Sequence, residues 1–99
     1  MVVGTLRCDV LLGDVHSLKE KRSVVRPLVA ELARKFAVSA AETGDQDLHR
    51  RAEVSVALVA ADRRHVVDVL ASCERLVAGR PEIELLSART TVLDDDDLN

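Results

Sequence analysis

Aromatic side chains are almost absent from this chain. Among its 99 residues Phe36 is the one aromatic residue, and there is no Trp or Tyr. Proteins that bind single-stranded nucleic acid usually stack bases on aromatic side chains, and sites for quaternary ammonium ligands are often aromatic cages. The composition therefore argues against both kinds of site. Apolar residues still make up 47% of the chain, so the expected core consists of Val, Leu, Ala and Ile.

Glycine and cysteine are also scarce, with four and two residues. The sequence holds no P-loop, no glycine-rich dinucleotide loop and no Gly-x-Ser-x-Gly nucleophile motif. Cys8 and Cys73 lie in apolar stretches, without a second Cys or a His at metal-ligand spacing. We therefore predict two buried free thiols in a reducing cytoplasm, with no bound metal and no other cofactor.

Long apolar runs are missing as well. No run approaches the roughly 18 residues that a membrane-spanning helix needs, and the first residues lack the basic, apolar and cleavage regions of a secretory signal. These features predict a cytoplasmic protein that makes no membrane contact.

The formal net charge of −3 is unevenly distributed. Asp94 to Asp97 form one terminal run of four negative charges, and without it the chain is slightly basic. Acidic runs at a terminus are usually solvated tails. We therefore predict a single domain over residues 1–93, followed by a disordered acidic tail at residues 94–99.

Alternating apolar and polar residues predict two long strands, at 2–12 and 51–60, and two shorter or less regular ones, at 37–43 and 82–93. The first strand should direct every second side chain into the core, namely Leu6, Cys8, Val10 and Leu12. One face of the sheet is then covered and the other is open.

Helical spacing of apolar residues predicts helices at 17–36 and 63–78. Ser17 and Asp62 are suitable N-caps, and Glu20 completes a capping box with Ser17. The resulting order β-α-β-β-α-β is typical of the ferredoxin-like α+β fold, in which two helices cover one face of a four-stranded antiparallel sheet.

Positive charge concentrates at the start of the first predicted helix, where the helix dipole favours negative charge. Lys19, Arg22 and Arg26 fall within about 60° of one another around the helix axis, and Lys21 extends this basic patch across the first turn. Like charges at such spacing repel by a few tenths of a kcal/mol unless an anion meets them. The patch predicts phosphate contacts with RNA, although a solvated helix face explains the same residues.

Two neighbouring segments offer further candidates. His16 precedes the first helix, and His49, Arg50 and Arg51 lead into the third strand, so all four are possible contacts at the rim of the patch. Asp45, Asp47 and His49 alternate, so an extended loop would place them on one side, as a metal site or an acid/base pair requires. A turn formed by Asp residues explains the same loop without chemistry.

Three segments resemble the YlxP-like family, a bacterial family of unknown function: His16-Ser17-Leu18-Lys19-Glu20-Lys21-Arg22, Asp45-Gln46-Asp47-Leu48 and Arg51-Ala52-Glu53. The similarity covers about residues 1–93. It implies a ferredoxin-like fold and no known catalytic residues. Genes of this family often lie beside those of transcription-elongation, translation-initiation and ribosome-maturation factors. The family usually has His in place of Asp45 and often an aromatic residue in place of His49.

Together these observations predict an RNA- or ribosome-associated accessory protein that is not an enzyme and forms a homodimer. The first alternative is a protein-interaction module that forms homodimers or binds a partner through an edge strand or the open sheet face. The second is a small metal- or acid/base-dependent enzyme built around His16 and the loop at residues 45–49.

Overall fold

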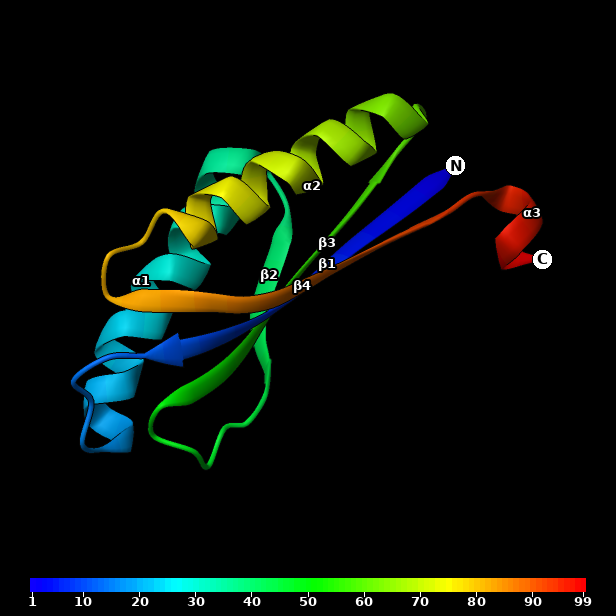
Figure 1. Cartoon of the computed structure of the whole chain (residues 1–99). Helices are drawn as coiled ribbons and strands as arrows, with labels where there is room; N and C mark the ends of the chain where they lie inside the picture. The colour runs from blue at the N-terminus through cyan, green and yellow to red at the C-terminus, as the bar shows by residue number, and fades with distance from the viewer.

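Two helices cover one face of a four-stranded antiparallel sheet in the computed structural model, which describes residues 1–99 (Figure 1). The elements follow in the order β1 (Val2–Leu12), α1 (Leu18–Phe36), β2 (Ser39–Gly44), β3 (Arg51–Ala60), α2 (Arg63–Ala78), β4 (Ile83–Leu93) and α3 (Asp95–Leu98). This confirms the predicted ferredoxin-like α+β fold. None of the helices is long and apolar enough to cross a membrane.

The strands lie in the order β2-β3-β1-β4, so β1 and β3 are central and β2 and β4 form the two edges. Register places Cys8 of β1 opposite Val54 of β3 and opposite Ala88 of β4. The pairing of β1 with β4 shifts between Asp9 and Val10, where β4 contains one extra residue, Leu86. Such a bulge twists an edge strand locally.

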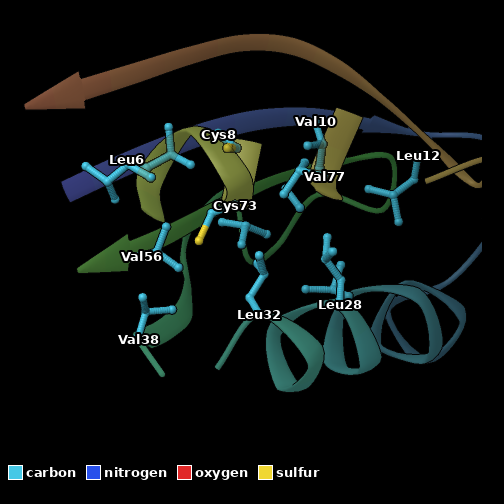
Figure 2. Close-up of a cluster of buried hydrophobic side chains, with 14 of the residues drawn as sticks. Leu6, Cys8, Val10, Leu12, Leu28, Leu32, Val38, Val56, Cys73 and Val77 are labelled. Carbon is cyan, nitrogen blue, oxygen red and sulfur yellow. The ribbon is translucent and has the colours of Figure 1, made fainter. Parts of the chain in front are cut away.

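The core lies between the helices and the covered face of the sheet (Figure 2). Alternation in β1 holds as predicted, because Leu6, Cys8, Val10 and Leu12 are all at most 1% exposed. The helices contribute the opposing layer of buried side chains, which comprises Val25, Leu28, Leu32, Val66, Leu70, Cys73 and Val77.

Gly4 allows α2 to lie close to β1. A Cβ atom at this position would meet Val66 Cγ1 at 2.3 Å and Leu70 Cδ1 at 2.9 Å. Both atoms belong to buried side chains of α2, so the absent side chain sets how closely this helix approaches the sheet.

The start and end of α1 follow from local residues. Ser17 Oγ accepts a hydrogen bond from the amide N of Glu20 (3.1 Å), as a capping residue should. The Glu20 carboxylate accepts from the amide N of His16 (3.2 Å) instead of closing the predicted box on Ser17. Ala37 ends the helix with a left-handed backbone (φ 55°), and β2 therefore begins at Ser39, two residues later than the predicted strand.

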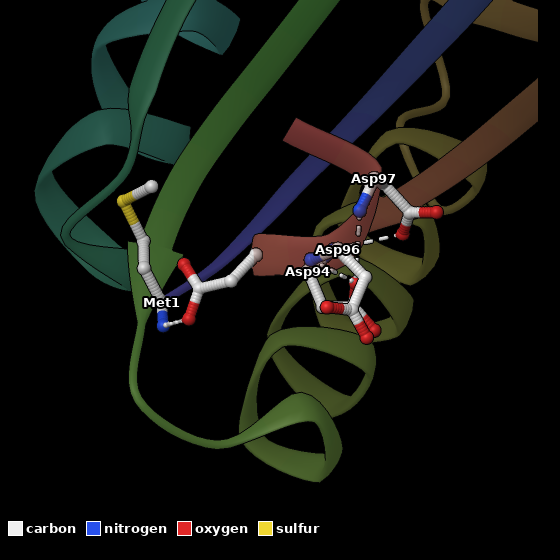
Figure 3. Close-up of polar contacts among 5 residues, drawn as sticks. Met1, Asp94, Asp96 and Asp97 are labelled. Carbon is white, nitrogen blue, oxygen red and sulfur yellow. Dashed lines mark hydrogen bonds and ion pairs between the residues drawn. The ribbon is translucent and has the colours of Figure 1, made fainter. Parts of the chain in front are cut away.

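The acidic run at the C-terminus contains a single helical turn, α3. Asp94 caps the single turn α3 by accepting hydrogen bonds from the amides of Asp96 and Asp97, and the Asp97 carboxylate accepts from the amide of Asp94 (Figure 3). The bonds to the Asp94 carboxylate, chiefly that from Asp97, lower its pKa. The Met1 ammonium lies 2.9 Å from an Asp95 carboxylate oxygen. Asp is a strong N-cap residue, so this short acidic run satisfies its own backbone donors.

Candidate nucleic-acid interface on helix α1

Three cations share one solvent-facing side of α1. Lys19, Arg22 and Arg26 are exposed, and together with Ser23 and Pro27 they line a shallow surface hollow. None of the three takes part in an ion pair within the protein. We call these three residues the basic ridge. Because no carboxylate neutralises it, the ridge presents uncompensated positive charge to solvent.

Lys21 does not belong to this surface, which corrects the prediction that it contacts phosphate. Its side chain is 2% exposed, and its Nζ donates to the carbonyl oxygens of Asp45 (2.6 Å) and Leu48 (2.8 Å). The same Nζ lies 2.9 Å from Glu42 Oε2. The ammonium group thus has two hydrogen-bond acceptors in the β2–β3 loop and a carboxylate within ion-pair distance, so Lys21 holds this loop against α1.

The β2–β3 loop is a closed turn and not the extended segment that a metal site would need. The amide of Leu48 donates to the carbonyl of Asp45 (3.0 Å), and Asp45 has a left-handed backbone (φ 59°). No group of three or more His, Cys, Asp or Glu residues is arranged to hold a metal ion. The structure therefore favours the interpretation in which Asp residues form a turn over the one in which Asp45, Asp47 and His49 line up on one side of an extended loop.

Of the remaining candidate residues, three lie near the start of α1 and one, Arg51, lies on the open face of the sheet. The start of α1 and the β2–β3 loop lie at the same end of the molecule (Figure 1). His16, His49 and Arg50 belong to this end, because Lys21 Nζ bonds to the β2–β3 loop and the Arg50 Nε donates to the carbonyl of Gly13 (3.1 Å). His49 is exposed and makes no side-chain hydrogen bond or ion pair.

His16 Nε2 lies 2.7 Å from Asp14 Oδ1, and both side chains are exposed. This carboxylate makes His16 a weaker phosphate contact than the residues of the ridge. Arg51 lies on the open face of the sheet, where it pairs with Asp9. It is therefore removed from the candidate interface.

Sequence reasoning missed the role of Lys21, although a signal was present. Lys21 falls on the same helical stripe as Val25, Leu28 and Leu32, all buried. A lysine at an apolar position of a stripe needs a buried acceptor, and the Glu42 carboxylate together with two loop carbonyls fills that need.

Comparison with known proteins identifies the family of this chain. The model of the family described as "Protein of unknown function (DUF503)" matches residues 3–90, and the chain belongs to this family. It is also similar to the "Uncharacterized protein YlxP" of Bacillus subtilis (strain 168), with 33% identity over 89 residues that cover 90% of this chain and 97% of that protein. The resemblance to the YlxP-like family is thereby confirmed.

Proposed function

We propose that this protein is an RNA- or ribosome-associated accessory protein that binds phosphate groups through the basic ridge. The observation that carries the proposal is the absence of any internal partner for Lys19, Arg22 and Arg26, which lie together on the exposed side of one helix. Lys21 and Arg51, by contrast, are paired with carboxylates within the protein.

The spacing of the ridge suits an extended polyanion. Lys19 and Arg26 are seven residues apart, which corresponds to about 10 Å along the helix axis. Arg pairs with phosphate oxygens in a bidentate manner, whereas Lys acts as a point charge. A run of backbone phosphates along α1 would contact all three side chains and remove the mutual repulsion of neighbouring cations.

Recognition should depend on the backbone and the shape of the RNA. The chain has no Trp or Tyr, and its one aromatic residue, Phe36, stands at the opposite end of α1 from Lys19. Contacts to phosphates position a protein on nucleic acid without reading its sequence. We therefore expect binding to structured RNA with little base preference.

The direct test compares two triple variants that lose equal charge. Lys19→Gln/Arg22→Gln/Arg26→Gln removes the ridge, and Arg34→Gln/Arg63→Gln/Arg64→Gln removes three exposed cations elsewhere. Binding to an RNA hairpin is measured over a range of salt concentrations. Loss of the ridge should reduce the slope of log affinity against log salt by roughly 0.7–0.9 per lost contact. Equal weakening by both variants would overturn the proposal.

A homodimer is the second candidate, and the outer edge of β4 favours it. This edge strand runs over eleven residues, carries one charged side chain between Leu85 and Leu93, that of Arg89, and exposes 43% of Leu86. Free edges of this kind readily pair with another strand. Light scattering should give twice the chain mass of 10.8 kDa, and Leu86→Lys should shift the mass towards the monomer. A monomeric wild-type protein at high concentration would exclude this candidate.

A further inference from the structure

We propose that the open face of the sheet holds a second anion site, separate from the basic ridge, which binds a phosphate group between Arg7 of β1 and Arg89 of β4. The site goes beyond the proposed RNA contact of α1, because these residues lie on the sheet face that the helices leave uncovered.

Register brings the four donors of this site together. Arg7 is directly opposite Arg89, and Thr5 is directly opposite Thr91. Directly opposed residues of an antiparallel pair have Cβ atoms about 4.5–5.5 Å apart, so both guanidinium groups can converge on one tetrahedral anion. All four side chains line the same hollow in the sheet face, of about 520 Å³.

The charges on this face are unbalanced at the arginine pair. Like charges directly opposite each other across a sheet are destabilising. The one carboxylate within ion-pair distance of Arg7 is that of Glu53, whose Oε1 lies 3.9 Å from Arg7 Nε and accepts a hydrogen bond from Thr43 Oγ1 (3.0 Å). Asp9 and Asp45 also line a hollow beside the two arginines, but neither forms an ion pair with them. Arg89 forms no ion pair. An anion between the two arginines would supply the missing negative charge.

Arg51 provides the contrast within the same face. It also lies on the open side of the sheet, but Asp9 pairs with it directly. The face therefore has one arginine with a close carboxylate partner, and an opposed pair in which Arg7 has only the 3.9 Å contact with Glu53 and Arg89 forms no ion pair. The weak pairing of Arg7 and Arg89 with carboxylates therefore follows from their positions in the sheet and is not shared by every arginine on this face.

The flanking hydroxyls complete the set of donors. Thr5 and Thr91 are exposed and make no side-chain hydrogen bond within the protein. Arg forms bidentate hydrogen bonds to phosphate oxygens, and the two hydroxyls can donate to the oxygens that remain. No aromatic side chain borders the hollow, so the phosphate group itself is what the site would recognise.

Titration with inorganic phosphate, followed by NMR amide shifts at constant ionic strength, tests the site. We expect saturable shifts at residues 5–7 and 89–91. Arg7→Gln and Arg89→Gln should each weaken binding about tenfold, in line with the loss of a charge-assisted contact. Glu53→Gln should strengthen binding, because it removes the competing carboxylate.

The controls separate this site from the ridge. Arg64→Gln removes one exposed charge on α2 and should leave phosphate affinity unchanged. The triple ridge variant should also bind inorganic phosphate with unchanged affinity, even though its binding to RNA is lost. Shifts confined to α1, an equal effect of Arg64→Gln, or unchanged affinity in Arg7→Gln and Arg89→Gln would overturn the proposal.

Two competition experiments distinguish a small phosphorylated ligand from nucleic-acid backbone as the source of the phosphate. Competition with inorganic phosphate by glycerol 3-phosphate, but not by a short RNA duplex, would confirm the site and assign it to a small phosphorylated ligand. Competition by the duplex that requires Arg89 would confirm the site and assign it to backbone phosphate.

Discussion

Lys21 Nζ on α1 lies 2.9 Å from Glu42 Oε2 on β2, and this ion pair is the most buried one in the protein. The Lys21 side chain is 2% exposed and that of Glu42 is 23% exposed. The carbonyl oxygens of Asp45 and Leu48 accept hydrogen bonds from the same ammonium group. The most basic segment of the sequence thus serves two purposes, since one lysine organises a loop and its neighbours remain free.

Replacing Lys21 with Met should lower the free energy of unfolding by about 3 kcal/mol, because removing one partner of a buried pair leaves the other charge uncompensated. The partial exposure of Glu42 keeps the effect at the lower end of the usual range. The matched control is Lys19→Met, which removes the same charge from an exposed position and should change stability by less than about 0.5 kcal/mol. Urea denaturation measures both, and similar stabilities for the two variants would contradict the account.

The two lysines show what the sequence could predict and what it could not. Helical periodicity gave α2 the correct bounds and placed α1 within one residue of its true start. Counting charges could not separate exposed Lys19 from buried Lys21, because the acceptors of Lys21 come from a strand and a loop more than twenty residues away.

Gly4→Ala should destabilise the fold by about 1–3 kcal/mol, because the new methyl group would overlap Val66 Cγ1. Val66 is fully buried and has a stiff, β-branched side chain, so relief requires α2 to move away from β1. Gly13→Ala serves as the control, since its Cβ would meet nothing closer than the Glu82 carbonyl oxygen at 3.7 Å. Thermal unfolding of both variants is the measurement, and an unchanged midpoint for Gly4→Ala would refute the close approach.

The thiols should be unreactive in the folded protein. Burial, with a smaller contribution from the nearby Glu74 charge, raises the pKa of Cys8 from 9.0 to about 12, and burial also raises the pKa of Cys73. The unfolded chain therefore releases these protons at lower pH than the folded chain. Stability should be unaffected by the thiols below pH 9 and should fall as the pH rises from 9 towards 12.

Labelling with a thiol-specific disulfide reagent at pH 8 checks the prediction. The native protein should react slowly and the urea-unfolded protein rapidly, because the thiolate is the reactive form. Rapid reaction of both thiols in the native state would show that Cys8 and Cys73 are accessible, contrary to the structure. Cys73→Ala isolates the reaction of Cys8.

In the sheet, as in α1, the sequence predicts which face a residue lies on but does not predict which distant residue it meets. Alternation in β1 puts Arg7 and Asp9 on the open face, where ion pairs join Arg7 to Glu53 and Arg51 to Asp9. The sequence did not show that Arg89 lies opposite Arg7, because this depends on the β1–β4 register and on the bulge at Leu86. A bulge changes which side chains share a face without leaving a regular signature in the sequence.

Sedimentation of cell extract on a gradient tests the central claim most directly. The extract contains either the wild-type protein or the variant Lys19→Gln/Arg22→Gln/Arg26→Gln, and each is run at low and at high salt. We expect the wild-type protein to travel with ribosomal or other RNA-containing particles at low salt and to be released at high salt, because phosphate contacts weaken as salt rises. The variant should remain at the top of the gradient at both salt concentrations. Wild-type protein that stays at the top at low salt, or a variant that sediments with it, would contradict the assignment of the basic ridge as an RNA-binding surface.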